Sequence, residues 1–145
     1  MSFANGGASV IVKNPHDYVP SREDEANEAG LESGRFVERS GDGYVGGDAG
    51  GLIVGLPIEP DKVKGEALDD GERIRLFPPL SGMILDLPIA SGENVADDEF
   101  LVVNSNGYLR AYDGAGGDSP ADRVAQATEA TDASGGVTYG NVEVL

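Results

Sequence analysis

The chain contains no cysteine and no long apolar run among its 145 residues. Without cysteine it can form neither a disulfide nor a thiolate, which fits assembly in a reducing compartment. No segment approaches the ~20 consecutive apolar residues of a membrane span. The amino terminus lacks the basic start and apolar stretch of a secretory signal. We therefore expect a soluble protein that has no membrane partner and is not exported by a signal of its own.

Basic residues are also scarce, with 10 Lys+Arg against 26 Asp+Glu and a net charge of -16. Phosphate binding needs a basic surface, so nucleic acid is not an expected partner. Such an acidic excess repels itself in dilute salt, but at molar salt the Debye length falls to about 3 Å and the repulsion is screened. This composition indicates a hypersaline host; an ordinary acidic surface is the alternative. The 39% hydrophobic residues favour a folded core over disorder.

The length predicts one domain with one core. We assign residues 1–33 to an amino-terminal arm and residues 34–145 to a β-rich domain. Within the arm, residues 8–13 ("ASVIVK") predict a short strand with Val10 and Val12 on one face.

The second half of the arm, residues 20–30 ("PSREDEANEAG"), predicts a short acidic helix. Ser21 is its candidate N-cap and Gly30 its stop. The segment has almost no apolar face, so the helix either docks through Leu31 or frays.

Beyond the arm, turn signals recur every 8 to 12 residues between short apolar runs, which is typical of an all-β fold. The expected class is a small β-sandwich or β-barrel-like (β-tulip-type) domain with at most one or two short helices. The expected strands lie at residues 35–39, 52–58, 72–77, 82–89, 99–112 (two runs joined at Asn106-Gly107) and 137–145.

Two features near the carboxyl terminus carry specific expectations. Residues 119–132 have a helix-like N-cap at Ser119 and proline at the first helical position, but they also alternate like a strand. This choice stays open from the residues alone. Gly140, inside the last strand, indicates a bulge or a close approach of another chain segment.

The sequence offers no constellation typical of an enzyme. "GDGYVG" at residues 41–46 matches a dinucleotide-binding pattern, but no helix can begin there to face a pyrophosphate. His16, the only histidine, lies among prolines, as expected of an exposed turn residue rather than a general base. The acidic groups at residues 69–70 and 97–99 lack the spacing of a calcium loop. We expect no catalytic residue, no cofactor and no metal.

A lipoyl or biotinyl carrier domain is a sharper alternative, since "PPLSGMILDLPIASGENVADDEFLVV" looks like the strand, turn and strand of those domains. Carrier function requires a lysine at the tip of the next hairpin. Here the tip is "NSNG", and no lysine follows Lys64. A carrier-like fold stays possible, but the activity is excluded.

Four segments together resemble the head-decoration, or capsid-cement, proteins of tailed double-stranded DNA viruses. They are "IASGENVADDEFLVV" (89–103), "SNGYLRAY" (105–112), "RVAQATEATDASGG" (123–136) and "NVEVL" (141–145). Upstream, "GRFVERSGDGYV" looks like the start of the family's domain. The resemblance covers roughly residues 34–145 and favours strand over helix at 119–132. Where the family usually has a glycine, this chain has Asp97, so the turn there is expected to differ.

The resemblance implies a structural virion protein, often trimeric, that binds the outer surface of an assembled icosahedral capsid and braces it. Its partners would be the major capsid protein and further copies of itself, after assembly in the host cytoplasm; the composition adds an extreme halophile as the host. An arm with strand-forming residues suits addition to a neighbour's sheet. The candidate interface residues are Phe3, Val10, Ile11, Val12, Tyr18 and Leu31. A β-rich surface or polysaccharide-binding module remains the alternative, although the chain has no tryptophan for stacking.

Overall fold

The computed structural model describes residues 10–17, 19–48, 50–55 and 65–145. Regular structure in these residues is almost entirely β, apart from one 3-10 turn, η2 (Pro120–Asp122). The all-β prediction is confirmed. None of the described segments forms a helix that is long and apolar enough to cross a membrane.

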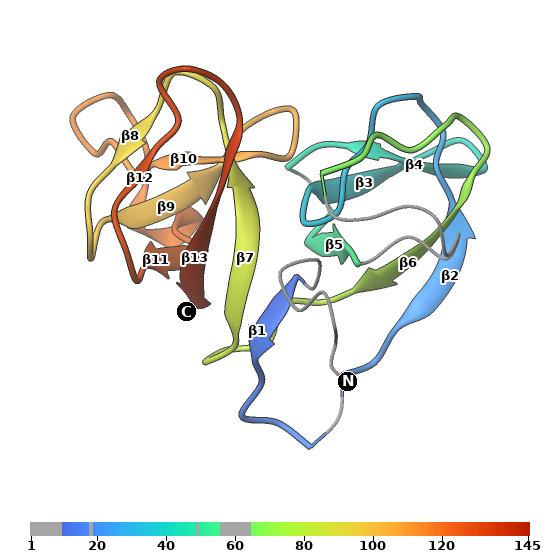
Figure 1. Ribbon diagram of the computed structural model, residues 1–145, viewed down its shortest axis with the longest axis horizontal. Helices are drawn as coiled ribbons and strands as arrows, with labels where there is room; N and C mark the ends of the chain where they lie inside the picture. The colour runs from blue at the N-terminus through green and yellow to red at the C-terminus, as the bar shows by residue number, and fades with distance from the viewer. Residues whose placement is uncertain (1–9, 18, 49, 56–64) are drawn as a thin grey trace.

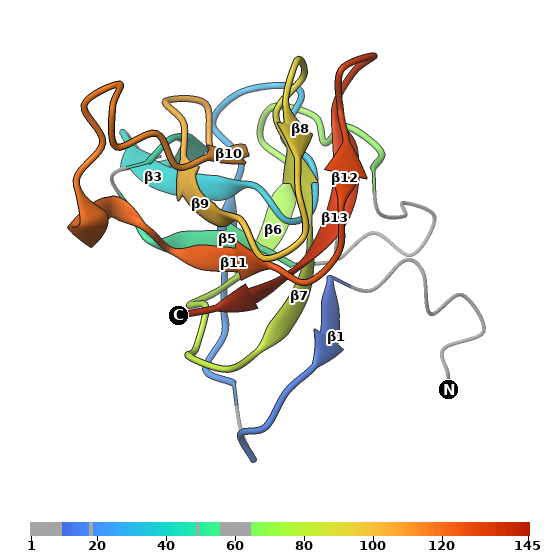
Figure 2. The same ribbon diagram turned by 90° about the vertical axis from the view of Figure 1, so that its left-hand side faces the viewer.

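Five strands of the carboxyl-terminal half close into a β-barrel, the C-terminal barrel (Figures 1 and 2). The strand order is β7-β10-β9-β11-β13, and β13 pairs back onto β7. The strands are β7 (Ile84–Ile89), β9 (Phe100–Val103), β10 (Leu109–Ala111), β11 (Ala125–Ala127) and β13 (Thr138–Val144). The ladder between β7 and β13 runs antiparallel from Thr138↔Ile89 to Glu143↔Ile84. Closure pairs both edges of every strand in the ring.

Three short strands are attached to this barrel. β1 (Ile11–Lys13) pairs antiparallel with the start of β7, with a register shift between Ile11 and Lys13. β8 (Asn94–Val95) and β12 (Thr131–Asp132) pair with each other. At Gly140, β13 passes so close to Thr131 that a side chain there would collide with the threonine. The close approach expected at Gly140 is confirmed.

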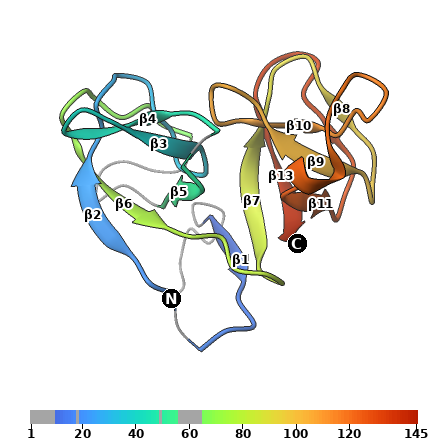
Figure 3. The same cartoon turned by 180° about the vertical axis from the view of Figure 1, so that it is seen from behind.

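A second sheet, the N-terminal sheet, lies beside the barrel and has the order β2-β6-β5-β3-β4 (Figure 3). Its strands are β2 (Arg22–Glu25), β3 (Phe36–Ser40), β4 (Gly43–Gly46), β5 (Leu52–Val54) and β6 (Arg73–Phe77). The sheet curls until its ends meet, because Ala26 forms an isolated parallel bridge with Tyr44. The amide of Asn27 donates to the Tyr44 carbonyl at 2.7 Å.

Most buried apolar side chains of the described residues belong to one of two clusters. One lies within the N-terminal sheet and includes Leu31, Val37, Val54 and Leu76. The other fills the C-terminal barrel, and it also contains Phe36, Ile53 and Phe77 from the N-terminal sheet. Because side chains alternate between the faces of a strand, β3, β5 and β6 each supply both clusters with neighbouring residues. The expected single core is therefore wrong: two clusters share one wall.

The amino-terminal segment differs most from its prediction. The expected helix at residues 20–30 is wrong, since Arg22–Glu25 form strand β2. β2 pairs along its whole length with β6, where Glu23 faces Arg75 and Glu25 faces Arg73. These opposite-charge pairs and the β6 ladder outweigh a helical tendency that had little apolar surface behind it. Residues 10–33, assigned to an arm, thus contribute one strand to each sheet.

The other expected strands match the structure closely. β3, β6, β7, β9, β10 and β13 fall within or next to the expected ranges, and β5 covers Leu52–Val54, while residues 56–58 lie outside the described part. The ambiguous segment 119–132 resolves into η2, β11 and β12. Ser119 and Asp122 form a capping box, so the helix signal was real but lasts a single turn.

Candidate interaction surfaces

The structure separates the six predicted interface residues. Val10 and Leu31 are buried, with exposed fractions of 2% and 0%. Ile11 is half-buried, and Val12 is exposed at 53%. Phe3 and Tyr18 lie outside the described residues.

Val10 and Leu31 do not form one surface, because they belong to the two different clusters. The amide of Asp86 donates to the Val10 carbonyl at 2.7 Å, which ties that residue to β7. Val10 and Val12 also differ in burial, although strand alternation placed them on one face. The register shift in β1 accounts for this, since an extra residue reverses the side-chain order beyond it. Among the predicted residues with a described position, Val12 is left as the exposed apolar side chain.

The Asn106-Gly107 turn of the barrel is hydrogen-bonded to residues 35 and 36 at the start of β3 in the N-terminal sheet. The Arg35 guanidinium, 9% exposed as a residue, donates to the Asn106 carbonyl through Nε at 3.1 Å and Nη2 at 2.7 Å. The amide of Phe36 donates to the Gly107 carbonyl at 2.9 Å. At Gly107, φ is 91°, and a side chain would collide with the Phe36 carbonyl. Glycine is required there because the strand of the other sheet passes so closely.

Two tyrosines of the barrel add further bonds across the same junction. The Tyr108 hydroxyl donates to Glu32 Oε1 at 2.7 Å, and its ring lies 4.5 Å under the Arg35 guanidinium. Burial, followed by this hydrogen bond, raises the pKa of Tyr108 to about 12. The Tyr139 hydroxyl donates to the Ser33 carbonyl at 2.7 Å. Burial raises the pKa of Tyr139 as well. The junction is thus a neutral-tyrosine, charged-arginine network that holds the sheets together.

The loop between β10 and β11 is largely exposed, including residues 113–117. Arg110 donates two hydrogen bonds to Asp118 in this loop, from Nη1 to Oδ2 at 2.7 Å and from Nη2 to Oδ1 at 2.8 Å. The amide of Asp113 donates to Asp118 Oδ2 at 2.8 Å. The Arg110 bonds, and then the Asp113 amide, hold the pKa of Asp118 at about 2. These bonds fix a glycine-rich loop in one conformation.

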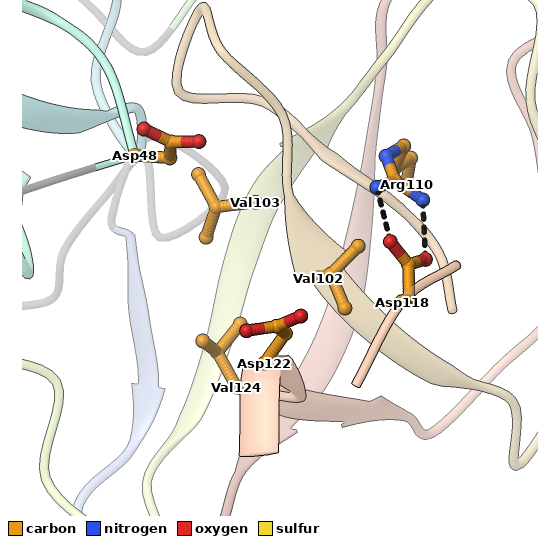
Figure 4. A pocket seen from close by; sticks show the side chains of 7 residues that line it. All are labelled: Asp48, Val102, Val103, Arg110, Asp118, Asp122 and Val124. Carbon is orange, nitrogen blue, oxygen red and sulfur yellow. Dashed lines mark hydrogen bonds and ion pairs between the residues drawn. The ribbon is translucent and has the colours of Figure 1, made fainter. Parts of the chain in front are cut away.

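A pocket of about 430 Å³ lies beside this loop. Its lining residues are Asp48, Val102, Val103, Arg110, Asp118, Asp122 and Val124. Figure 4 shows Asp48 approaching from the N-terminal sheet side, while the other six come from β9, β10 and the β10–β11 loop. The Asp118 carboxylate already accepts hydrogen bonds from Arg110, and Asp122 accepts one from the Ser119 amide at 2.9 Å. Within the described residues, no group of three His, Cys, Asp or Glu side chains is placed to hold a metal ion.

On the same outer side of β9 and β10, Arg123 is held between two aromatic rings. Its guanidinium carbon lies 4.6 Å from the centre of the Phe100 ring and 5.7 Å from that of Tyr112. Its Nε donates to the Pro120 carbonyl at 2.9 Å, so the η2 turn helps to position the guanidinium. We call Phe100, Tyr112 and Arg123 the arginine–aromatic platform.

The remaining motifs lie in one hairpin and in turns; Gly43–Gly46, expected as part of a glycine-rich loop, form strand β4. "GDGYVG" forms the β3–β4 hairpin, in which Ser40 pairs with Gly43. His16 is exposed, with Nε2 2.8 Å from the Ser81 carbonyl oxygen. In the 97–99 turn, Asp98 adopts a φ of 68°, and Glu99 accepts from the Ala96 amide. Aspartate tolerates this left-handed conformation better than most side chains do.

Comparison with known proteins shows a shared fold. No protein-family model matches the chain, and no curated protein matches it. Among solved structures, the chain is similar to the head fiber gp8.5 N base of bacteriophage phi29, with a TM-score of 0.54 and 13% sequence identity. The similarity covers 88% of this chain and 95% of that chain. It therefore includes both the C-terminal barrel and the N-terminal sheet.

Sequence reasoning missed the arginines that organise these surfaces. In a chain with 10 basic and 26 acidic residues, each arginine is a candidate for a specific structural or binding role. Arg35, beside a predicted strand, and Arg110 and Arg123, flanking a glycine-rich loop, could have been singled out on that ground. Their partners could not, because Asn106 lies 71 residues from Arg35.

Proposed function

We propose that this chain is a structural protein of a tailed-virus head, which binds the outer surface of the assembled capsid and stabilises it. The observation that carries the proposal is the fold similarity to the base of a phage head fiber over nearly the full length of both chains. The resemblance of residues 34–145 to head-decoration proteins supports the same assignment from the sequence. The role is one of binding and bracing, without a chemical reaction.

The architecture suits that role mechanically. A brace must resist deformation, and here two sheets share a continuous apolar wall through Phe36, Ile53 and Phe77. Arg35 adds hydrogen bonds across the same boundary. Stiff parts lose less conformational entropy on binding, so more of the contact energy remains as affinity.

The partners we propose are the major capsid protein and two further copies of this chain on the capsid surface. A trimer placed where several shell subunits meet ties them together, and linked contacts raise the effective affinity by ~10² to 10⁴. Binding only to the assembled shell stabilises it by mass action, by about 2.7 kcal/mol per site when free protein is at 100 times its dissociation constant. The net charge of -16 further suggests a virus of an extreme halophile.

The test uses heads of the virus whose genome encodes the chain, prepared with and without it. Purified chain should bind heads that lack it, appear on their outer surface in a cryo-electron microscopy reconstruction, and raise their disruption temperature. Binding to unassembled capsid protein should be much weaker. Absence of the chain from purified heads, together with no binding to heads that lack it, would falsify the proposal.

The structural neighbour favours a second candidate, a base that anchors a fiber to the head. A base need not strengthen the shell, so the disruption temperature separates the two roles. Heads that keep the chain, disrupt at an unchanged temperature and carry an additional projecting component would support the base. Heads that become more heat-resistant without any such component would support the cement role.

A further inference from the structure

The arginine–aromatic platform is unusual in the charge environment of this protein. Five described arginines form ion pairs: Arg35 with Glu32, Arg39 with Asp24, Arg73 and Arg75 with Glu23, and Arg110 with Asp118. Within the described part of the chain, no carboxylate lies within 4.0 Å of the Arg123 guanidinium. Acidic residues outnumber basic ones by 26 to 10, so carboxylates are plentiful.

Arg123 is nevertheless held firmly. Two rings and the Pro120 carbonyl fix its guanidinium, and Phe100, Tyr112 and Arg123 are all half-buried. Lys13 and Arg22 also lack a described carboxylate partner, but both are exposed. Among the described residues, Arg22 stacks on one ring, that of Tyr44 at 5.3 Å. The Arg123 side chain is thus already held in one conformation, so binding would cost it little further entropy. Its two terminal nitrogens have no described acceptor.

The chemistry of the platform selects its ligand. A guanidinium presents parallel N–H groups that match the two oxygens of a carboxylate, and stacking through its face leaves these in-plane N–H groups available for hydrogen bonds. Arginine and aromatic residues are enriched at the centres of protein interfaces, where their charge is desolvated. We propose that Phe100, Tyr112 and Arg123 form a docking site for an aspartate or glutamate side chain of the capsid protein.

This inference rests on the proposed function and names the chemistry of its contact. The interface residues predicted from the sequence all lie within residues 1–33, whereas the platform is formed by Phe100 of β9 and by Tyr112 and Arg123 of the β10–β11 loop. The expected interaction is a fork of two N–H···O bonds from Arg123, with Phe100 and Tyr112 excluding water from the contact.

The experiment measures binding of the full chain to heads that lack it. R123Q should weaken binding by about 30-fold, since an arginine at the centre of an interface contributes that much. R123K should recover only part of the loss, because an ammonium keeps the charge but neither stacks nor forks. R39Q is the matched control: Arg39 also stacks on a ring, Tyr44 at 4.9 Å, but already pairs with Asp24 at 3.5 Å. Far-ultraviolet circular dichroism and melting temperatures should be alike in all three variants.

A second arm identifies the group on the head. Surface carboxylates are converted to amides with a carbodiimide and glycinamide, after which wild-type chain and R123Q should bind with the same reduced affinity. If R123Q binds untreated heads as tightly as R39Q does, the platform is not a docking site. If wild-type chain binds amidated heads undiminished, the ligand is not a carboxylate and the proposal is overturned. Failure of the wild-type chain to bind any heads would remove the proposed function itself, and the platform's partner with it.

Discussion

The C-terminal barrel and the N-terminal sheet reach similar shapes by different means. The barrel closes by continuous strand pairing from β7 around to β13, and its ladder includes six paired positions between those two strands. The N-terminal sheet closes through a single bridge between Ala26 and Tyr44. One sheet is therefore secured by its own backbone, whereas the other depends more on side chains and on its neighbour.

The distribution of apolar residues follows the same asymmetry. The N-terminal sheet has its own cluster, yet it also directs Phe36, Ile53 and Phe77 into the cluster of the barrel. In an isolated N-terminal sheet these side chains would face water, at a cost of about 1.5–3 kcal/mol each. The N-terminal sheet is therefore stabilised largely by docking against the barrel.

Phe36→Ala should have the largest effect, because it removes a side chain from the shared wall. We expect a loss of about 3–5 kcal/mol in the free energy of unfolding. The N-terminal sheet should then melt before the barrel, giving two thermal transitions by calorimetry. Leu31→Ala is the control, since Leu31 is 0% exposed but belongs only to the N-terminal cluster. It should cost about 2–5 kcal/mol and keep one transition. A single transition in both variants would show that the sheets are coupled by something other than Phe36.

Arg35→Met should weaken the same boundary through its polar contacts. The change leaves the Asn106 carbonyl without the two donors it now has, and leaves the Glu32 carboxylate with the Tyr108 hydroxyl but without Arg35. A buried acceptor left unsatisfied costs about 1–3 kcal/mol, measurable by urea denaturation. Arg39→Met, at an exposed arginine, should change stability by no more than about 0.5 kcal/mol. Equal effects of the two changes would contradict a bonding role for Arg35.

Salt should stabilise the protein, and more strongly through the barrel. Residues 1–82 contain 15 acidic and eight basic residues, whereas residues 83–145 contain 11 acidic and two basic. Screening of this repulsion should raise the melting temperature by a few degrees between dilute and molar sodium chloride, since about 1 kcal/mol corresponds to about 3 °C in a chain of this length. In Phe36→Ala, the barrel transition should move further with salt than the sheet transition. A flat or falling melting temperature would remove the halophilic interpretation.

Acid should loosen the β10–β11 loop. The pKa of Asp118 is lowered from 3.8 to about 2 in the folded chain. Its contribution is therefore fully present above about pH 4 and is lost as the pH falls through about 2. The amide resonance of Asp113, which donates to Asp118, should titrate in that range by nuclear magnetic resonance. Asp118→Asn should abolish this titration, and an unchanged profile would show that another group is responsible.

Local patterns predicted the strands but not how the sheets are assembled. The alternation of Ile74 and Leu76 with Arg73 and Arg75 marked β6 correctly, because one face of that strand is exposed. The pattern of β2 is almost wholly polar, and its strand exists only because β6 offers a partner. The sequence did not predict a second apolar cluster either. Neighbouring residues such as Phe36 and Val37 are both apolar, and their pattern does not show that each packs into a different cluster. The surfaces built on Arg35 and Arg123 depend on such long-range placement.

The pairing of both terminal strands with β7 determines how the chain would carry a mechanical load. β1 and β13 each run antiparallel to β7, so they run parallel to each other. Tension applied between Val10 and Leu145 would pull the two strands in opposite directions along the axis of β7. The hydrogen bonds of both ladders would then be loaded in shear, all at once, rather than opened one after another from an end. Single-molecule stretching from these two positions would measure the force at which the ladders yield.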